Sequence, residues 1–129
     1  GDPEAQVVIP RMRSDLLAAM DAVGYQRLKD YKLELEDSVA AAVILASEGY
    51  PGKYEKGKTI TLPKAGAGVQ VFHAGTKQDR DQLVTSGGRV MAVTALAKDF
   101  KEALSAIYQH IEEIEFSGKY FRKDIGYDL

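Results

Sequence analysis

The sequence predicts an α+β fold, in which a small antiparallel β-sheet, curled like half of a barrel, packs against helices. Residues 39–47 form a nearly continuous apolar run, VAAAVILAS, which is typical of a buried strand. Several β-branched segments follow, and glycine-rich turns separate them. Residues 99–114 instead carry apolar side chains at three- and four-residue spacing, which indicates an amphipathic helix. Together these patterns favour one sheet with a helix near each end of the chain.

Residues 4–23 are the first predicted helix. Pro10 lacks a backbone N–H, so we expect a kink or a late helix start at that position. Gly24 is expected to end the helix in a left-handed conformation. Residues 25–37 are charged and mixed, and they predict a connector with room for one short helical turn. The apolar stripe of this helix consists of Ile9, Met12, Leu16, Met20 and Val23.

Residues 38–97 predict the sheet. The strand at 39–47 is expected to be buried on both faces, and a glycine-rich loop at 48–58 leads to a short strand at 59–62. A turn at 64–68 precedes a strand at 69–73. Two more strands are predicted at 82–85 and 89–97. We expect them to form one hairpin across Ser86, Gly87 and Gly88, because a glycine pair can adopt the positive φ of a tight turn.

The last predicted element is a helix that begins after Asp99. Asp99 and Glu102 have the spacing of a capping box, and residues 117–118 are expected to end the helix. His110 precedes an acidic pair and is expected on the surface. The tail from residue 119 is too mixed to assign, and we expect salt-bridged packing of Arg122, Lys123 and Asp124 onto the domain. The buried stripe of the helix is predicted to be Phe100, Ala103, Leu104, Ile107, Ile111 and Ile114.

Composition restricts the class of protein. A chain of 129 residues is about one domain, and it contains no cysteine, which excludes a disulfide framework and thiolate metal sites. A net charge of −2 gives no electrostatic footprint for nucleic acid or an anionic membrane. The longest apolar run is too short to cross a bilayer, and no basic segment followed by an apolar one opens the chain. We therefore expect a cytoplasmic domain without nucleic-acid or membrane partners.

Residues 52–59, GKYEKGKT, match the phosphate-binding P-loop pattern. That motif works where a helix leaves the loop, because helical N–H groups then face the phosphates. Here the following residues, TITLP, alternate as a strand does, and Glu55 would place a negative charge at the phosphates. The match is therefore interpreted as accidental. A biotinyl or lipoyl carrier domain is also disfavoured, because no Met-Lys-Met occurs at the predicted hairpin tip.

Five runs of sequence resemble the C-terminal part of phosphoribosylamine–glycine ligase (glycinamide ribonucleotide synthetase), a family of the ATP-grasp superfamily. They occur in the order of that family and reach from residue 1 to residue 127. The runs are GDPEAQ at 1–6, ASEGYPGKYEKGK at 46–58, FHAGT at 72–76, TSGGRVMAVTA at 85–95 and YFRKDIGY at 120–127. The resemblance implies a sheet of the hybrid-motif type found in C-terminal domains of ATP-grasp enzymes.

The resemblance also implies an activity and a division of the chain. Enzymes of this family join glycine to 5-phosphoribosylamine with hydrolysis of ATP to ADP and phosphate in purine biosynthesis. Residues 1–37 would be the tail end of the ATP-grasp domain, and residues 38–129 the C-terminal domain. ATP and Mg²⁺ (or Mn²⁺) would bind mainly to the N-terminal ATP-grasp domains, whose metal-binding glutamate and asparagine lie upstream of GDPE. We therefore expect no cofactor in this fragment, no catalytic residue in it, and no activity from it alone.

Asp2 and Glu4 are the candidate residues for the glycine side of the site. By resemblance, their carboxylates line this side, where they could hold an ammonium group through charge-assisted hydrogen bonds. The alternative is a frayed chain end with solvated carboxylates.

Arg89 is the candidate for the phosphate of phosphoribosylamine. Exposed backbone N–H groups of Ser86, Gly87 and Gly88, together with the guanidinium fork, would make a phosphate grip. The alternative is an arginine on a solvated strand edge.

His73, Thr76 and Lys77 are candidates for the same ribose-phosphate pocket. No second histidine or cysteine stands at ligand spacing from His73, so a metal role is disfavoured. A structural hydrogen bond is the alternative for this histidine. For the whole chain, the alternative function is a stand-alone phosphate-ligand binding or interaction module without catalysis.

Overall fold

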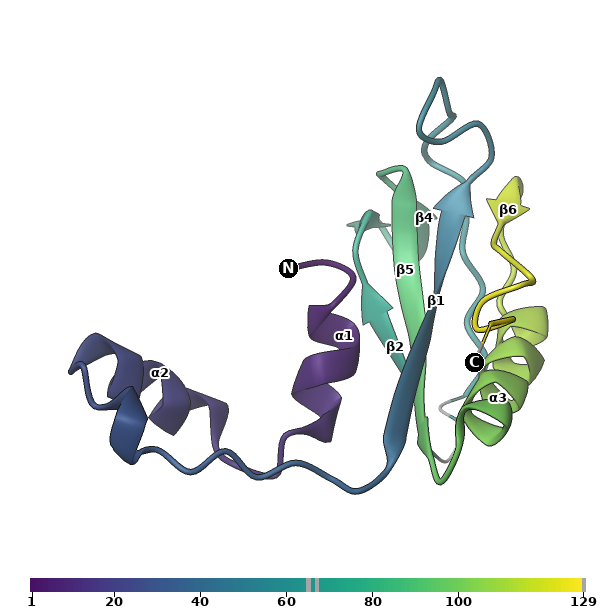
Figure 1. Cartoon of the computed structure of the whole chain (residues 1–129). Helices are drawn as coiled ribbons and strands as arrows, with labels where there is room; N and C mark the ends of the chain where they lie inside the picture. Colours follow the sequence, from purple (N-terminus) through teal and green to yellow (C-terminus); the bar gives the residue numbers. More distant parts are fainter. Residues whose placement is uncertain (65, 67, 129) are drawn as a thin grey trace.

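An antiparallel four-stranded sheet with helices on both faces forms the centre of the computed structural model, which describes residues 1–64, 66 and 68–128 (Figure 1). The strand order is β2-β5-β1-β6. Helix α3 (Phe100–Glu113) covers one face, which we call the inner face, and α1 (Ala5–Val8) lies against the opposite, outer face. The predicted α+β class is thus confirmed. The four strands are β1 (Val39–Ser47), β2 (Val69–His73), β5 (Arg89–Ala97) and β6 (Lys119–Tyr120).

Strands β1, β2 and β5 have the bounds that the sequence predicts. In their register Val43 pairs with Val93, which in turn pairs with Val71, so these three side chains share the inner face. They join the core cluster beneath α3. On the outer face, Ala42 and Ile44 are only half-buried. The prediction that β1 is buried on both faces therefore holds fully only for the inner one.

A β-bulge interrupts the pairing of β1 with β5. Leu45 pairs with Met91, but the next residue, Ala46, pairs with Arg89, so Val90 is an extra residue on β5. Ala46 follows Ile44 by two positions and shares its outer face. The bulge therefore brings Arg89 to the outer face, on the side of α1.

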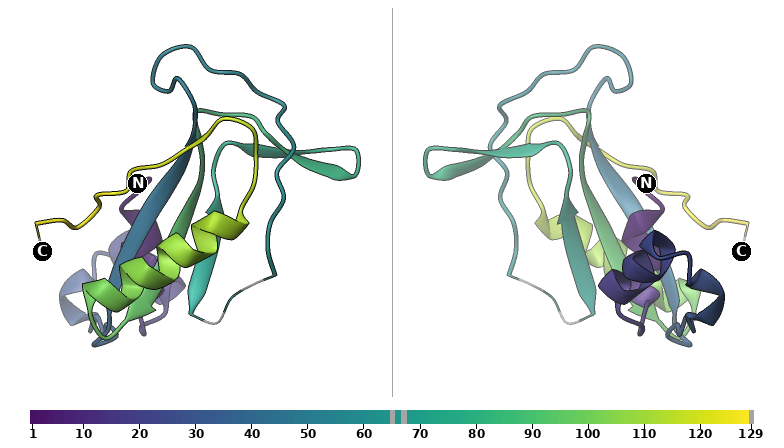
Figure 2. Two further views of the ribbon diagram at one scale, coloured as in Figure 1. Left: turned by 90° about the vertical axis from the view of Figure 1, so that its right-hand side faces the viewer. Right: turned by 90° about the vertical axis from the view of Figure 1, so that its left-hand side faces the viewer.

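The predicted hairpin across residues 86–88 is wrong. Strand β4 (Gln82–Thr85) pairs instead with β3 (Thr76–Asp79), which the sequence analysis missed, and Arg80 in their turn has a φ of 54°. This hairpin projects from the main sheet (Figure 2). Residues 86–88, here called the glycine strap, then lead into β5 without positive φ.

The strap needs glycine for space rather than for a turn. A Cβ on Gly87 would lie 2.9 Å from Gly75 Cα, and a Cβ on Gly88 would lie 2.0 Å from a ring carbon of Tyr50. Both distances are below ordinary van der Waals contact, so only glycine allows these segments to approach so closely.

Residues 59–62 do not form the regular strand that was predicted. Thr59 makes a single bridge to Val84, and Thr61 makes one to Glu115. Ile60 lies between them and is buried in the core. The segment is extended, but its partners lie in two different elements, so it cannot build a continuous ladder. Of the turn predicted at 64–68, Ala65 and Ala67 lie outside the described residues.

Helix α3 begins where the sequence predicts. The Asp99 carboxylate accepts a hydrogen bond from the Glu102 backbone N–H at 2.9 Å, while the Glu102 side chain forms an ion pair with Lys98 instead of reaching back to Asp99. At the other end, Lys119 Nζ donates to the carbonyl oxygens of Ile111 and Ile114, at 2.8 and 2.6 Å. Together these contacts satisfy backbone groups that a helix leaves unpaired at its ends.

The buried face of α3 largely agrees with the prediction. Ala103, Ile107, Ile111 and Ile114 are buried, Leu104 is half-buried, and Phe100 is exposed. His110 is buried, with only 8% of its surface exposed, so its predicted surface position is wrong. Its position three residues after Ile107 and seven after Ala103 places it on the same helix face, and this spacing outweighs the acidic residues that follow it.

The single helix predicted over residues 4–23 is also wrong, because the segment is broken. After α1 come a 3₁₀ turn, η1 (Ile9–Arg11), and α2 (Leu16–Gly24). Between these two, the backbone N–H groups of Arg13 and Ser14 bond to the Glu34 carbonyl. The connector thus takes the backbone N–H groups that would otherwise bond within a continuous helix. Asp15 caps α2, and Gln26, not Gly24, has the left-handed φ, at 56°.

Residues 25–37 contain the predicted short helical turn, η2 (Leu28–Asp30). Helix α2 packs mainly against this turn and lies away from the sheet (Figure 1). All of residues 1–37 are described, and only Ala22 among them is buried. The larger apolar side chains of Leu17, Met20 and Val23 in α2 are instead exposed, with Leu17 at 75%. None of the described helices is long and apolar enough to span a membrane.

Candidate functional site

Asp2 and Arg89 meet on the outer face of the sheet. The closest atoms of this ion pair, Asp2 Oδ2 and Arg89 Nε, lie 2.9 Å apart. Their side chains are 34% and 43% exposed, so the pair lies at the surface and is partly shielded from water. The chain start is held in place because Ala5 N–H donates to the Gly1 carbonyl at 2.7 Å. The structure thus brings together two candidate residues that the sequence analysis assigned to different substrates.

The glycine strap positions the start of β5, where Arg89 lies. The Ser47 backbone N–H donates to the Gly88 carbonyl at 2.8 Å, and the Ser47 hydroxyl donates to the Gly87 carbonyl at 3.0 Å. On the other side, Gly75 N–H donates to the Arg89 carbonyl at 2.8 Å. Hydrogen bonds from two neighbouring segments therefore fix the backbone that carries the Arg89 side chain.

Two backbone donors of the strap are not exposed as expected. The N–H groups of Ser86 and Gly87 both donate to the Gly75 carbonyl, at 2.7 and 3.1 Å. A phosphate could not take them without breaking these bonds. The phosphate grip predicted from the sequence therefore loses two of its three backbone donors and rests mainly on the Arg89 guanidinium.

A groove of about 450 Å³ runs along the outer face beside this pair. Ala42, Ile44 and Ala46 of β1 form its apolar floor, and Glu4 and Arg89 contribute charged groups. The ring of Tyr50, which packs on Gly88, also lines it. The sequence analysis missed Tyr50. An aromatic residue between two glycines of a polar loop was the signal that could have indicated it.

His73, Thr76 and Lys77 lie elsewhere. His73 pairs with Met91 and alternates with Val71, which places it on the inner face, opposite to Arg89. Its Nδ1 atom lies 3.0 Å from the Thr76 hydroxyl. Lys77 is exposed on β3 of the projecting hairpin. The register thus separates these three candidates from the groove that contains Glu4 and Arg89.

The P-loop match at residues 52–59 lacks the required helix, as the sequence analysis expected. The residues after Gly57 are extended, and Thr59 bridges to Val84. Lys58 forms an ion pair with Glu55 of the same loop, which holds the pKa of that carboxyl below its ordinary value. The lysine that would contact phosphates in a P-loop is therefore already paired.

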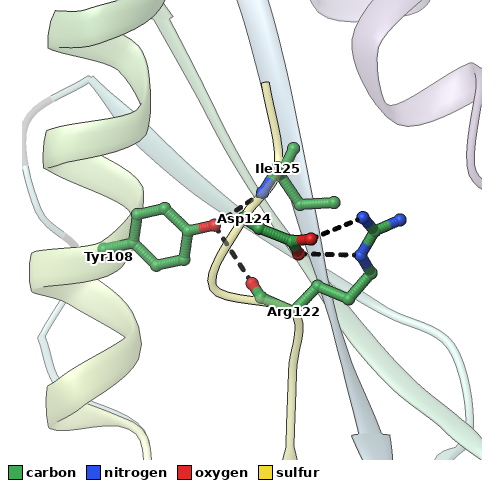
Figure 3. A network of polar contacts seen from close by, with 4 residues as sticks. All are labelled: Tyr108, Arg122, Asp124 and Ile125. Carbon is green, nitrogen blue, oxygen red and sulfur yellow. Dashed lines mark hydrogen bonds and ion pairs between the residues drawn. The ribbon is translucent and has the colours of Figure 1, made fainter. Parts of the chain in front are cut away.

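The C-terminal tail forms the other wall of the groove. Figure 3 shows the polar contacts within the tail and between the tail and Tyr108. Arg122 donates two hydrogen bonds to Asp124, both 2.9 Å long, and this pairing holds the pKa of the Asp124 carboxyl below its ordinary value. Tyr108 of α3 donates its hydroxyl to the Arg122 carbonyl at 3.0 Å and accepts from Ile125 N–H at 3.4 Å. The ion pair is therefore internal to the tail, and the tyrosine joins the tail to the domain.

Within residues 1–64, 66 and 68–128, no cluster of three or more histidine, aspartate or glutamate side chains could hold a metal ion.

Comparison with known proteins identifies the family. Residues 40–128 match the family model described as "Phosphoribosylglycinamide synthetase, C domain". The chain belongs to this family. The resemblance that was inferred from the five sequence runs is confirmed, and the matched range covers the sheet, apart from the first residue of β1, and α3.

Two relatives and one solved structure support this family assignment. Over 98% of its length, the chain is 51% identical to phosphoribosylamine–glycine ligase of Chlorobaculum tepidum and 48% identical to the trifunctional purine biosynthetic protein adenosine-3 of Gallus gallus. It covers 30% and 13% of these two proteins. A crystal structure of phosphoribosylamine–glycine ligase from Thermotoga maritima matches 96% of the chain with a TM-score of 0.77 and 33% identity, and the match covers 30% of that protein. The chain thus spans about a third or less of these relatives.

Proposed function

We propose that this chain forms the C-terminal part of a phosphoribosylamine–glycine ligase and completes the phosphoribosylamine side of its active site. The observation that carries the proposal is the meeting of Asp2 and Arg89 beside the outer-face groove in a member of this family. In the whole enzyme, ATP would phosphorylate the carboxylate of glycine. The amine of phosphoribosylamine would then attack the acyl carbon and displace phosphate, leaving ADP, phosphate and glycinamide ribonucleotide.

Arg89 is proposed to bind the 5-phosphate of phosphoribosylamine. A guanidinium matches phosphate oxygens bidentately and stays charged at neutral pH. It also has more N–H donors than one carboxylate can accept, so the ion pair with Asp2 leaves donors for a phosphate. The partly shielded position strengthens such a contact, because charges near a protein surface interact more strongly than charges in bulk water.

Glu4 is proposed to line the glycine side of the same site, where the resemblance also places Asp2. Glu4 lies in the groove with Arg89, and it forms no ion pair with a cation of the described residues. A carboxylate in that position would attract the ammonium group of glycine. The proposed site does not use His73, Thr76 or Lys77, which lie on the inner face or on the projecting hairpin.

Residues 1–37 are proposed to belong to the preceding ATP-grasp domain, and residues 38–129 to the C-terminal domain. The exposed apolar side chains of α2 support this division, since a helix normally buries such a stripe against its own domain. The start of the family match at residue 40 agrees with it. ATP and Mg²⁺ (or Mn²⁺) would bind to the ATP-grasp domains, so the chain alone is proposed to be inactive. A cytoplasmic location would accompany this biosynthetic role.

Steady-state kinetics of the full-length enzyme that carries this sequence test the role of Arg89. We expect Arg89→Ala to raise the KM of phosphoribosylamine and to leave the KM values of ATP and glycine nearly unchanged. Losing a charge-assisted contact costs about 1.5–3 kcal/mol, which corresponds to roughly a ten- to hundredfold increase in KM. Arg89→Lys should restore part of the affinity, because an ammonium group cannot reproduce the bidentate fork.

Arg80→Asn is a matched control, because it removes another exposed arginine of the domain and asparagine tolerates the left-handed φ of that turn. It should leave all three KM values unchanged. An equal loss for all three substrates in Arg89→Ala would indicate a folding defect, and no loss would leave Arg89 as a surface arginine.

A further inference from the structure

The contact between Asp2 and Arg89 joins the chain start to the first residue of β5. The Arg89 backbone is fixed through Gly75, as described above, but its long side chain has several rotatable bonds. An unrestrained arginine side chain loses much of its rotamer entropy when a ligand immobilises it. A partner that holds the guanidinium before the ligand arrives reduces this loss.

We propose that Asp2 is a positioning residue, which holds the Arg89 guanidinium in place for the phosphate of phosphoribosylamine. This inference rests on the proposed role of Arg89 in the site. It differs from the expectation that Asp2 binds glycine, because Asp2 then acts through Arg89 and touches neither substrate.

The surroundings of Asp2 favour this role. Its Oδ2 atom contacts Arg89, while its Oδ1 atom accepts a hydrogen bond from Gln6 Nε2 at 3.3 Å. Both carboxylate oxygens are thus engaged within the protein. Glu4, in contrast, lies in the groove and forms no ion pair with a described cation, so it is the better placed of the two carboxylates for the glycine ammonium.

A carboxylate beside a phosphate site also has an opposing effect. Asp2 repels the phosphate electrostatically, so removing its charge could strengthen binding. At a half-exposed site this repulsion is screened by water and salt, and we expect the lost positioning to outweigh it. The sign of the change in KM therefore distinguishes positioning from simple repulsion.

Kinetics of the full-length enzyme provide the test, with all three substrates varied in turn. Asp2→Ala should raise the KM of phosphoribosylamine about two- to fivefold, the range typical of a half-exposed ion pair, and leave kcat and the KM of glycine nearly unchanged. Asp2→Asn should have a smaller effect, because its amide oxygen can still accept from the guanidinium. Glu4→Gln is the comparison, and it should raise the KM of glycine and not that of phosphoribosylamine.

The double variant decides between direct and indirect action. If Asp2 acts through Arg89, Asp2→Ala should cause almost no further change in a protein that already carries Arg89→Ala. An undiminished effect in that background, a raised KM for glycine, or a lowered KM for phosphoribosylamine in Asp2→Ala would each overturn the inference. Failure of the proposed function is a separate result, in which Arg89→Ala itself leaves the KM of phosphoribosylamine unchanged.

Discussion

At the scale of single residues, the glycine strap depends on the absence of a side chain at its glycines. Gly75 and Gly87 face each other so closely that a Cβ on Gly75 would lie 2.6 Å from Gly87 Cα. Backbone atoms cannot move away as a side chain can, so a Cβ added at this contact would be tolerated less than one at Gly88. Gly88 differs, because its neighbour is the ring of Tyr50. These approaches hold the start of β5, and therefore Arg89, against two neighbouring segments.

The contact at Gly88 gives a test of the strap. We expect Gly88→Ala to destabilise the chain by about 1–3 kcal/mol, because the added methyl group would overlap the Tyr50 ring. Adding Tyr50→Ala should relieve part of that cost, which makes the double variant more stable than the sum of the two single changes predicts. Urea unfolding followed by circular dichroism measures all three.

Gly24→Ala is the control for the Gly88 experiment, because a Cβ on Gly24 would meet nothing within 4 Å and its φ is not positive. It should leave the free energy of unfolding unchanged or raise it slightly. If Gly88→Ala behaves like this control, the ring does not pack on the strap as described.

The sequence analysis could not foresee the role of these glycines. A pair of glycines between two strand-like segments is the usual sign of a hairpin, and local sequence holds no information about segments that approach from elsewhere. Arg89 and Asp2 were identified from the resemblance, but their contact depends on the bulge at Val90 and on the path of the chain start. The spacing and the secondary-structure propensity of residues do not predict such contacts between distant segments.

At the scale of elements, the spacing of apolar residues correctly predicted those strands and helices whose packing follows the local sequence pattern. Strands β1 and β5 and helix α3 have long apolar patterns, and their limits were predicted closely. The first predicted helix failed, although its apolar stripe was just as regular, because Glu34 takes the N–H groups of Arg13 and Ser14. A stripe at helical spacing thus does not show that one continuous helix carries it.

The core role of α3 leads to a prediction on stability. Ile107 is fully buried, so Ile107→Ala should lower the free energy of unfolding by about 2–5 kcal/mol through lost burial and a cavity. Leu104→Ala should cost less, because Leu104 is only half-buried. Leu17→Ala in α2 is the matched control. With 75% of Leu17 exposed, it should change the free energy by no more than about 0.5 kcal/mol. Similar losses at Ile107 and Leu17 in denaturant melts would contradict this assignment of the core.

At the scale of the whole molecule, the chain consists of a packed sheet domain and an N-terminal segment with little burial of its own. The main contacts of that segment with the sheet come from α1 and η1, while α2 packs mainly on η2. The proposed boundary after residue 37 therefore separates two regions of different stability. Local regions with few buried contacts open more easily than the core does.

We expect residues 38–129 alone to unfold cooperatively, because the core cluster lies entirely within them. Two helix caps of similar geometry test the same division within the full chain. Asp99→Ala should lower the global free energy of unfolding by about 1 kcal/mol, whereas Asp15→Ala should leave it nearly unchanged, because α2 can open by itself. Denaturant melts and amide hydrogen exchange measure both. A truncated chain without a cooperative transition would mean that the N-terminal segment is integral to the fold.

The bulge at Val90 also determines where the gene can gain or lose codons. Loss of the Val90 codon would make Arg89 the direct neighbour of Met91 and leave its side chain on the outer face, but it would remove a fully buried core side chain. The tip of the β3–β4 hairpin projects from the main sheet, so length changes there would leave the outer face intact. Insertions and deletions should therefore be tolerated at the tip of this hairpin but not between the glycine strap and Met91.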